Sequence, residues 1–142
     1  MPQLVNNESR GFTHFFRITG TELATTGYLT SSSEKLIASL PSGGIITNAA
    51  VVVNTALTGA SDITISVGTI TGTATNLIAG IDLDALTKVV YNTGSAIDTE
   101  PGLINNTIAA LPVFARFGGT VGSLTGGEFT IALTILDPGA IA

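Results

Sequence analysis

The sequence predicts an all-β fold: a single-domain antiparallel β-sandwich, jelly-roll-like, with at most one short helix. Strand-forming Val, Ile, Thr and Phe are abundant, and strong helix formers such as Glu, Lys, Gln and Arg are scarce. Seventeen glycines are available for turns. Seven or eight short apolar segments separated by turn residues are typical of a sandwich or a barrel. The chain of 142 residues is of a size that forms one domain.

The sandwich domain is predicted to span residues 12–142, after an N-terminal arm at residues 1–11 that shows no hydrophobic periodicity. A first strand is expected at 12–19 and a short one at 28–30. Residues 32–38 fit either a helical turn or a strand. The arm is expected to become ordered only on contact with another subunit.

The clearest strand spans residues 45–57. In a regular strand Ala49, Val51 and Val53 share one face with the other odd-numbered residues, and Ile46 and Ala50 share the other face. Both faces are fairly apolar, which predicts a central strand that is covered on both sides. A turn at 59–62 leads to an alternating strand at 63–67, and we expect these two strands to pair as a hairpin.

Further strands are expected at 77–81, around 107–111, at 113–117 and at 129–135, where Phe129, Ile131 and Leu133 alternate with smaller or polar residues. The glycines at 118–122 and 126–127 are interpreted as turn residues, because no Walker or Rossmann phosphate-binding pattern accompanies them. Residues 82–90 start with an aspartate suited to an N-cap and predict a short helix, although 89–91 could equally end in a strand.

The charge content of the chain is unusually low. Charged residues make up 11% of the sequence and hydrophobic residues 44%, whereas a typical soluble domain carries roughly 25% charged residues. The surface must therefore consist largely of Thr, Ser, Asn, Gly, Ala and apolar side chains, which suits a protein packed against other proteins. The net charge of −5 and five scattered basic residues argue against nucleic acid as a partner. No apolar run is long enough to span a membrane.

Residues suited to catalysis or metal binding are few. The absence of cysteine excludes thiol chemistry and Cys-ligated metals. His14, the single histidine, is interpreted as a strand residue between aromatic neighbours. Asp82 and Asp84 could contribute to a calcium site, but helix capping and a solvated loop is the preferred interpretation. Two glycosylation sequons, at Asn7 and Asn105, are attributed to chance. The sequence thus predicts no enzyme activity and no catalytic, cofactor or metal site.

The densest aromatic cluster consists of Phe12, Phe15 and Phe16, which are the candidate interface residues. Because adjacent strand residues point to opposite faces, Phe15 and Phe16 cannot both enter the core. Core packing explains one ring, and a subunit interface explains the outward one, since aromatic residues are enriched in interface cores. The sequence does not decide which ring faces outward.

Three segments occur in an informative order. Residues 44–57 read GIITNAAVVVNTAL, residues 63–69 read ITISVGT, and residues 124–133 read LTGGEFTIAL. This order resembles the small β-sandwich virion proteins of tailed bacteriophages, the capsid decoration or cement type. In that family a strand patterned g-x-I-x-x-a-x-V-x-V leads to an x-L-x-V-G strand and a late T-a-G-x-x-x-V strand. The resemblance covers about half of the chain and consists of strands and turns.

The resemblance implies a non-enzymatic protein without a cofactor that forms a trimer or dimer. It would bind junctions between major capsid protein subunits on the capsid surface of the virion and clamp the shell against genome pressure. No residue is carried over as a contact. Neither nucleic acid nor a membrane is expected as a partner. The N-terminal residues lack a signal-peptide pattern, so synthesis in the host cytoplasm is expected.

Other functions stay open from the sequence. A phage tail or fibre component would share the same composition. A carbohydrate- or receptor-binding β-sandwich would need an exposed aromatic platform or a calcium site in its loops, and the lack of Trp counts against it. An enzyme would need titratable groups clustered in a pocket, and the chain has few such groups.

Overall fold

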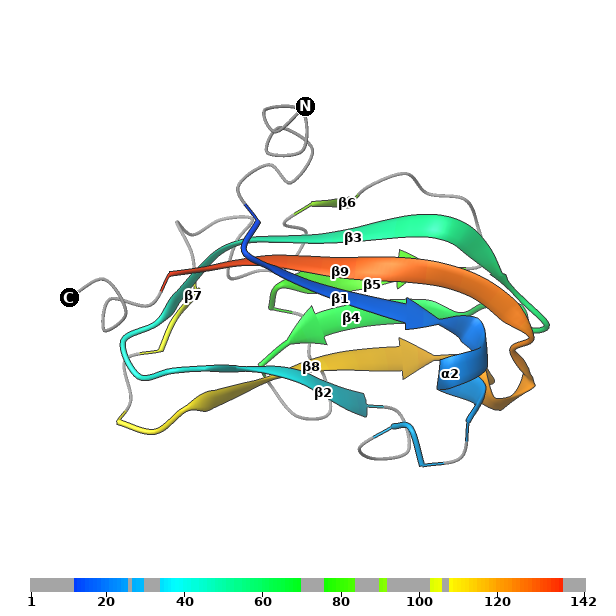
Figure 1. The fold of residues 1–142 in the computed structure, drawn as a ribbon, viewed down its shortest axis with the longest axis horizontal. Coiled ribbons are helices and arrows are strands. Elements are labelled where there is room, and N and C mark those ends of the chain that lie inside the picture. The colour runs from blue at the N-terminus through cyan, green and yellow to red at the C-terminus, as the bar shows by residue number, and fades with distance from the viewer. Residues whose placement is uncertain are drawn as a thin grey trace.

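The computed structural model describes residues 12–25, 27–29, 34–69, 76–83, 90–91, 103–105 and 108–136. These ranges contain one five-residue α-helix and a single 3-10 turn, and otherwise strands and their connections (Figure 1). The elements in chain order are β1 (His14–Thr19), α2 (Gly20–Ala24), β2 (Glu34–Leu40), β3 (Ile45–Thr58), β4 (Thr64–Gly68), β5 (Ile78–Asp82), β6 (Val90–Tyr91), β7 (Leu103–Ile104), β8 (Leu111–Gly118), η1 (Val121–Ser123) and β9 (Gly126–Leu136).

The described strands form two antiparallel sheets. Sheet A has the order β1-β9-β3-β6, with β7 paired to the start of β3, and sheet B has the order β2-β8-β4-β5. In each sheet an early strand lies beside a late one: β1 next to β9, and β2 next to β8 (Figure 1). Apart from the two-residue β7, this order of strands in the two sheets is that of a jelly roll. The predicted all-β sandwich is confirmed.

The core lies between the inner faces of the two sheets. Val51 of β3 and Ile131 of β9 are fully buried in sheet A, and Val113 of β8 is fully buried in sheet B. The rings of Phe117 and Phe129, one from each sheet, meet edge to face with centroids 6.0 Å apart. Each large apolar side chain buried in this way stabilises the fold by roughly 1.5–3 kcal/mol. The contact between the sheets therefore supplies most of the driving force for folding.

Most predicted strands are found, with shifted ends. β3, β4, β5, β8 and β9 occupy the predicted positions, and the ambiguous segment at 32–38 contributes to strand β2. Tyr28 and Leu29 are not in a strand, and residues 108–110 precede β8 instead of forming a strand of their own. The predicted arm at 1–11 and residues 84–89 of the predicted helix lie outside the described residues, while Asp82 ends β5.

The predicted hairpin of β3 and β4 is wrong. β3 pairs with β9 in sheet A, and β4 pairs with β8 and β5 in sheet B. Both strands have an apolar inner face. Each strand buries this face by packing against the opposite sheet across the core, and the two strands do not pair edge to edge. The turn at 59–62 therefore carries the chain from one sheet to the other. Within this turn Asp62 adopts a φ of 59°, a left-handed conformation that aspartate tolerates.

The predicted alternation through β3 is correct only in its middle. The register with β9 shifts between Ile46 and Asn48, and again after Val53. A bulge of this kind reverses which face the preceding residues occupy. Ile46 is therefore fully buried in the core together with Ala49, Val51 and Val53, although simple alternation places it on the opposite face.

The helix α2 was not predicted from the sequence. Thr19 is its N-cap: the Thr19 hydroxyl accepts a hydrogen bond from the Glu22 N–H at 3.2 Å, and the Glu22 carboxylate accepts one from the Thr19 N–H at 3.0 Å. This reciprocal pair is a capping box. The signal was present in the sequence as the spacing Thr-x-x-Glu directly after a strand.

Asn105 links two segments at one end of the sandwich by hydrogen bonds. Its side chain is 1% exposed, and its amide nitrogen donates to the carbonyls of Leu40 and Ala109, each at 2.9 Å. Its backbone accepts from Gly43 N–H and donates to the Gly44 carbonyl. The residue thus joins the β2–β3 turn to the segment after β7. A buried amide engaged in this way is a poor glycan acceptor, in line with a chance sequon.

Replacing Asn105 should destabilise the protein. Asn105→Ala removes the two hydrogen bonds that the buried amide donates to the Leu40 and Ala109 carbonyls, so the free energy of unfolding should fall by about 1–3 kcal/mol. Urea denaturation followed by circular dichroism measures the change. The matched control is Asn54→Ala at an exposed position, which should change the value by about 0.5 kcal/mol or less. Equal effects of the two substitutions would show that Asn105 does not fasten this end.

Gly20 should also resist substitution. It is buried at the start of α2, where a Cβ would run into the backbone carbonyl of Gly126. Gly20→Ala should therefore lower the free energy of unfolding by about 1–3 kcal/mol, the usual range for overpacking. Gly122→Ala is the control, because a Cβ there meets nothing within 4 Å. Thermal unfolding compares the two variants, and an unchanged midpoint for Gly20→Ala would contradict the close approach of α2 to β9.

Candidate interaction surface

The outer face of sheet A is the candidate interaction surface. It consists of those side chains of β1, β9 and β3 that alternate with the core side chains. The register places Phe15 opposite Ala132, and Ala132 opposite Ala50, in one row across the three strands. The adjacent row, which includes Phe16 and Ile131, points to the core.

Phe12 and Phe15 form the aromatic end of this surface. Their rings meet edge to face, with centroids 6.4 Å apart and an interplanar angle of 68°. Phe15 is 53% exposed, whereas its row neighbours Ala132 and Ala50 are 3% and 1% exposed. An accessible ring therefore stands beside small apolar side chains. Exposed aromatic surface of this kind is enriched at protein–protein contacts.

The structure decides which ring of the predicted cluster faces outward. Phe16 is partly buried and packs against the core, whereas Phe15 lies on the outer face. Phe12 is partly exposed just before β1 and contacts Phe15. Of the three candidate interface residues, Phe12 and Phe15 thus belong to the outer surface, and Phe16 belongs mainly to the core.

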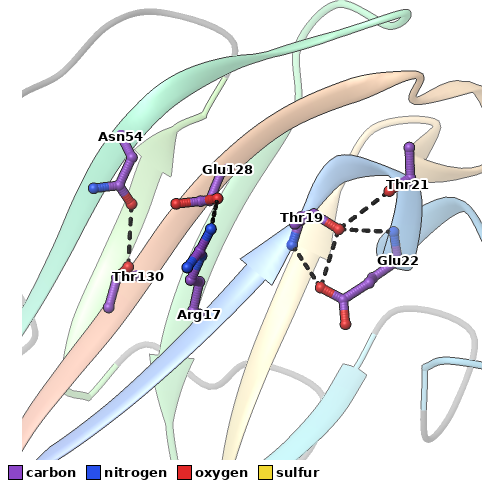
Figure 2. Close-up of polar contacts among 7 residues, drawn as sticks. All are labelled: Arg17, Thr19, Thr21, Glu22, Asn54, Glu128 and Thr130. Atoms are coloured by element: carbon purple, nitrogen blue, oxygen red, sulfur yellow. Dashed lines mark hydrogen bonds and ion pairs between the residues drawn. The ribbon is translucent and has the colours of Figure 1, made fainter.

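The other end of the same face is polar (Figure 2). Arg17 Nη2 donates to Glu128 Oε1 at 2.7 Å, and Thr130 Oγ1 donates to Asn54 Oδ1 at 3.1 Å. The Arg17 side chain stays 71% exposed despite this ion pair. An ion pair as exposed as this contributes at most about 1 kcal/mol to stability. Arg17 is therefore available for contacts beyond its own chain.

Sheet B has a second outer face of mixed character. Leu36 of β2 lies opposite Phe114 of β8 and is 46% exposed. The neighbouring pair is Glu34 and Arg116, whose Oε2 and Nη1 atoms are 3.8 Å apart. The Glu34 carboxylate is nearly buried, while Arg116 is partly exposed. Apolar and charged groups thus alternate across this face as well.

Tyr28, in the connection between α2 and β2, has an altered pKa. Partial burial raises the pKa of the Tyr28 hydroxyl, and the negative charge of Glu22 raises it further. The Lys35 ammonium lies 4.4 Å from the centre of the Tyr28 ring. The raised pKa favours the neutral hydroxyl in the folded state. Its contribution to stability is present below about pH 10 and is lost as the pH rises through the folded-state pKa.

The other residues weighed from the sequence are not brought together into a site. His14 is exposed at the start of β1, with Nδ1 2.7 Å from the Thr13 hydroxyl. Asp82 is exposed at the end of β5, and Asp84 lies outside the described residues, so the calcium hypothesis stays untested. Within the described ranges, no three His, Asp or Glu side chains form a group that could hold a metal ion. No helix in those ranges has the length and apolar character to cross a membrane.

Comparison with solved structures finds the same fold in a phage particle. A chain of the structure described as "Cyanophage Pam1 capsid asymmetric unit" superposes with a TM-score of 0.55 and 17% sequence identity. The match covers 84% of this chain and 79% of that chain. At this identity the likeness establishes a shared fold. No protein-family model matches the sequence, and no curated protein sequence matches it.

The two adjacent phenylalanines of β1 should respond differently to truncation. Phe16→Ala removes a ring packed against the core and should lower the free energy of unfolding by about 2 kcal/mol. Phe15→Ala removes an exposed ring and should lower it by about 0.5 kcal/mol or less. Urea denaturation in dilute solution measures both values. A larger loss for Phe15→Ala than for Phe16→Ala would mean that the assignment of the two faces is wrong.

Proposed function

We propose that this protein is a non-enzymatic structural component of a bacteriophage virion, a capsid decoration protein that binds and stabilises the head shell. The observation that carries the proposal is the jelly-roll fold shared with a chain of the Cyanophage Pam1 capsid over 84% of this sequence. The resemblance of segments 44–57, 63–69 and 124–133 to decoration proteins supports the same role and favours the head over the tail. The proposed partners are the major capsid protein and further copies of this chain.

The mechanism is mechanical and depends on buried surface. Phe12 and Phe15 give the outer face of sheet A an apolar end, and burying apolar surface contributes roughly 25 cal/mol per Å². A specific interface needs about 1,200–2,000 Å² in total. The polar end, with Arg17 and Glu128, would set the orientation of the docked protein, because complementary charges discriminate between alternative arrangements.

The low charge content follows from this role. With only 11% charged residues in the sequence, the chain has a surface that is costly to expose but suited to permanent contact with other subunits. Leu36 on sheet B and Phe15 on sheet A place accessible apolar groups on opposite faces of the sandwich. If the protein were held between neighbouring subunits on a shell, those neighbours would cover both faces.

The proposal is tested with heads that lack the protein. A phage that carries this gene is compared with its deletion mutant, and the heads are heated while rupture is followed by release of DNA. Mutant heads should rupture at a lower temperature, and adding the purified protein should restore the original rupture temperature. The added protein should also sediment with the mutant heads. Parent heads, whose sites are filled, should bind no additional protein. Presence of the protein in tails only, or unchanged rupture of mutant heads, would overturn the proposal.

A further inference from the structure

Strand β1 has an open edge. Among the described residues β1 forms strand pairs with β9 alone, so it ends sheet A on one side (Figure 1). Alternate backbone N–H and C=O groups of an edge strand point away from the sheet and can receive another strand. The same strand presents Phe15, 53% exposed, and Arg17, 71% exposed in its side chain, two residues apart on the outer face.

We propose that β1 pairs with β1 of a second copy of this chain, antiparallel and about a two-fold axis through Phe16, so that sheet A continues across a dimer. In this register Phe15 of each copy lies opposite Arg17 of the other, and the two copies of Phe16 lie opposite each other. A two-fold axis repeats every contact, so both exposed cations meet both exposed rings. A cation over an aromatic face is attractive, and directly opposed strand residues are close enough to form this contact.

The side-chain pattern of β1 selects this register over its neighbours. Directly opposed residues of antiparallel strands lie on the same face of the sheet. In a dimer whose two-fold axis is perpendicular to the sheet, the axis must therefore lie at one residue position and not between two successive residues. Only then do the outer faces of both copies lie on the same side. An axis through Arg17 would set the two guanidinium groups against each other. An axis through Phe15 would pair the two rings and leave each Arg17 opposite Thr13 of the other copy. Only the axis through Phe16 gives every exposed ring a cation.

The dimer would join the outer faces of two copies into one larger surface for the shell. This inference rests on the self-association in the proposed function. It is tested on purified protein without heads, whereas shell binding is tested by the rupture and sedimentation of heads. Failure of one can therefore be told from failure of the other.

Opposite charges introduced at Phe15 provide the first test. Sedimentation equilibrium of the wild type should show a monomer–dimer equilibrium. Phe15→Arg sets an arginine against Arg17 of the second copy at two places and should raise the dimer dissociation constant by about tenfold or more. Phe15→Glu sets an acid against the same Arg17 and should keep the dimer. Both changes are at an exposed site, and circular dichroism verifies that the fold is retained.

The outcomes that overturn the pairing are defined by the same measurements. A wild type that stays monomeric up to the highest soluble concentration would overturn it. An odd-numbered oligomer that is insensitive to both substitutions, or equal effects of Phe15→Arg and Phe15→Glu, would do so too. Loss of exposed aromatic surface alone would affect the two variants alike, so the difference between them is specific to Arg17.

Disulfide trapping tests the register directly, because the chain has no cysteine of its own. In a mixture of Phe15→Cys and Arg17→Cys proteins, a mixed dimer has its two cysteines at directly opposed positions. The Cα atoms, and likewise the Cβ atoms, of such residues are about 4.5–5.5 Å apart. Within either variant alone the thiols are diagonal, at about 7–8 Å, beyond the usual disulfide range. The mixture should therefore cross-link under mild oxidation and each variant alone should not. Cross-linking of the single variants without the mixed product would overturn the proposed register.

Discussion

The pairing of β3 with β9 organises sheet A and, through it, the whole sandwich. It joins residues that are 68 to 91 positions apart in the sequence and runs from Ile45 opposite Leu136 to Thr58 opposite Gly126. One register sets both faces of sheet A: Val51 and Ile131 meet in the core row, while Ala50 and Ala132 meet in the outer row. A slip of one residue would exchange the two faces, so the buried row holds the outer surface in place.

The same pairing places β1 at an edge. Since β9 is enclosed by β3 on one side, its other side is left for β1, and β1 then has no further strand among the described residues. The outer residues of β1, Phe15 and Arg17, are thereby brought to the edge of the described sheet. An exposed ring, an exposed cation and an edge that pairs with no further described strand are the elements of a strand-to-strand contact.

A jelly roll by itself does not define a function, because this architecture occurs in proteins with many different roles. The proposed role in a capsid therefore draws on the surface as well as on the fold. Phe12 and Phe15 on sheet A, and Leu36 beside Phe114 on sheet B, expose apolar groups on a chain with little charge to balance them. Contact with neighbouring subunits explains this surface in physical terms, since it would bury the apolar groups that the isolated domain leaves in water.

Three strands could be predicted from the sequence alone, because their signals are local: an apolar, β-branched run at 45–57, and alternation of apolar with polar or small residues at 63–67 and 129–135. The signal for the helix after Thr19 is equally local, because its capping box is present in the sequence as Thr-x-x-Glu. Strand partners were not local: β3 and β4 follow each other yet belong to different sheets, because each pairs where its apolar face can meet the core. The outward orientation of Phe15, the core position of Ile46 just before a bulge, and the burial of Asn105 likewise required the tertiary structure, since each depends on residues distant in the chain.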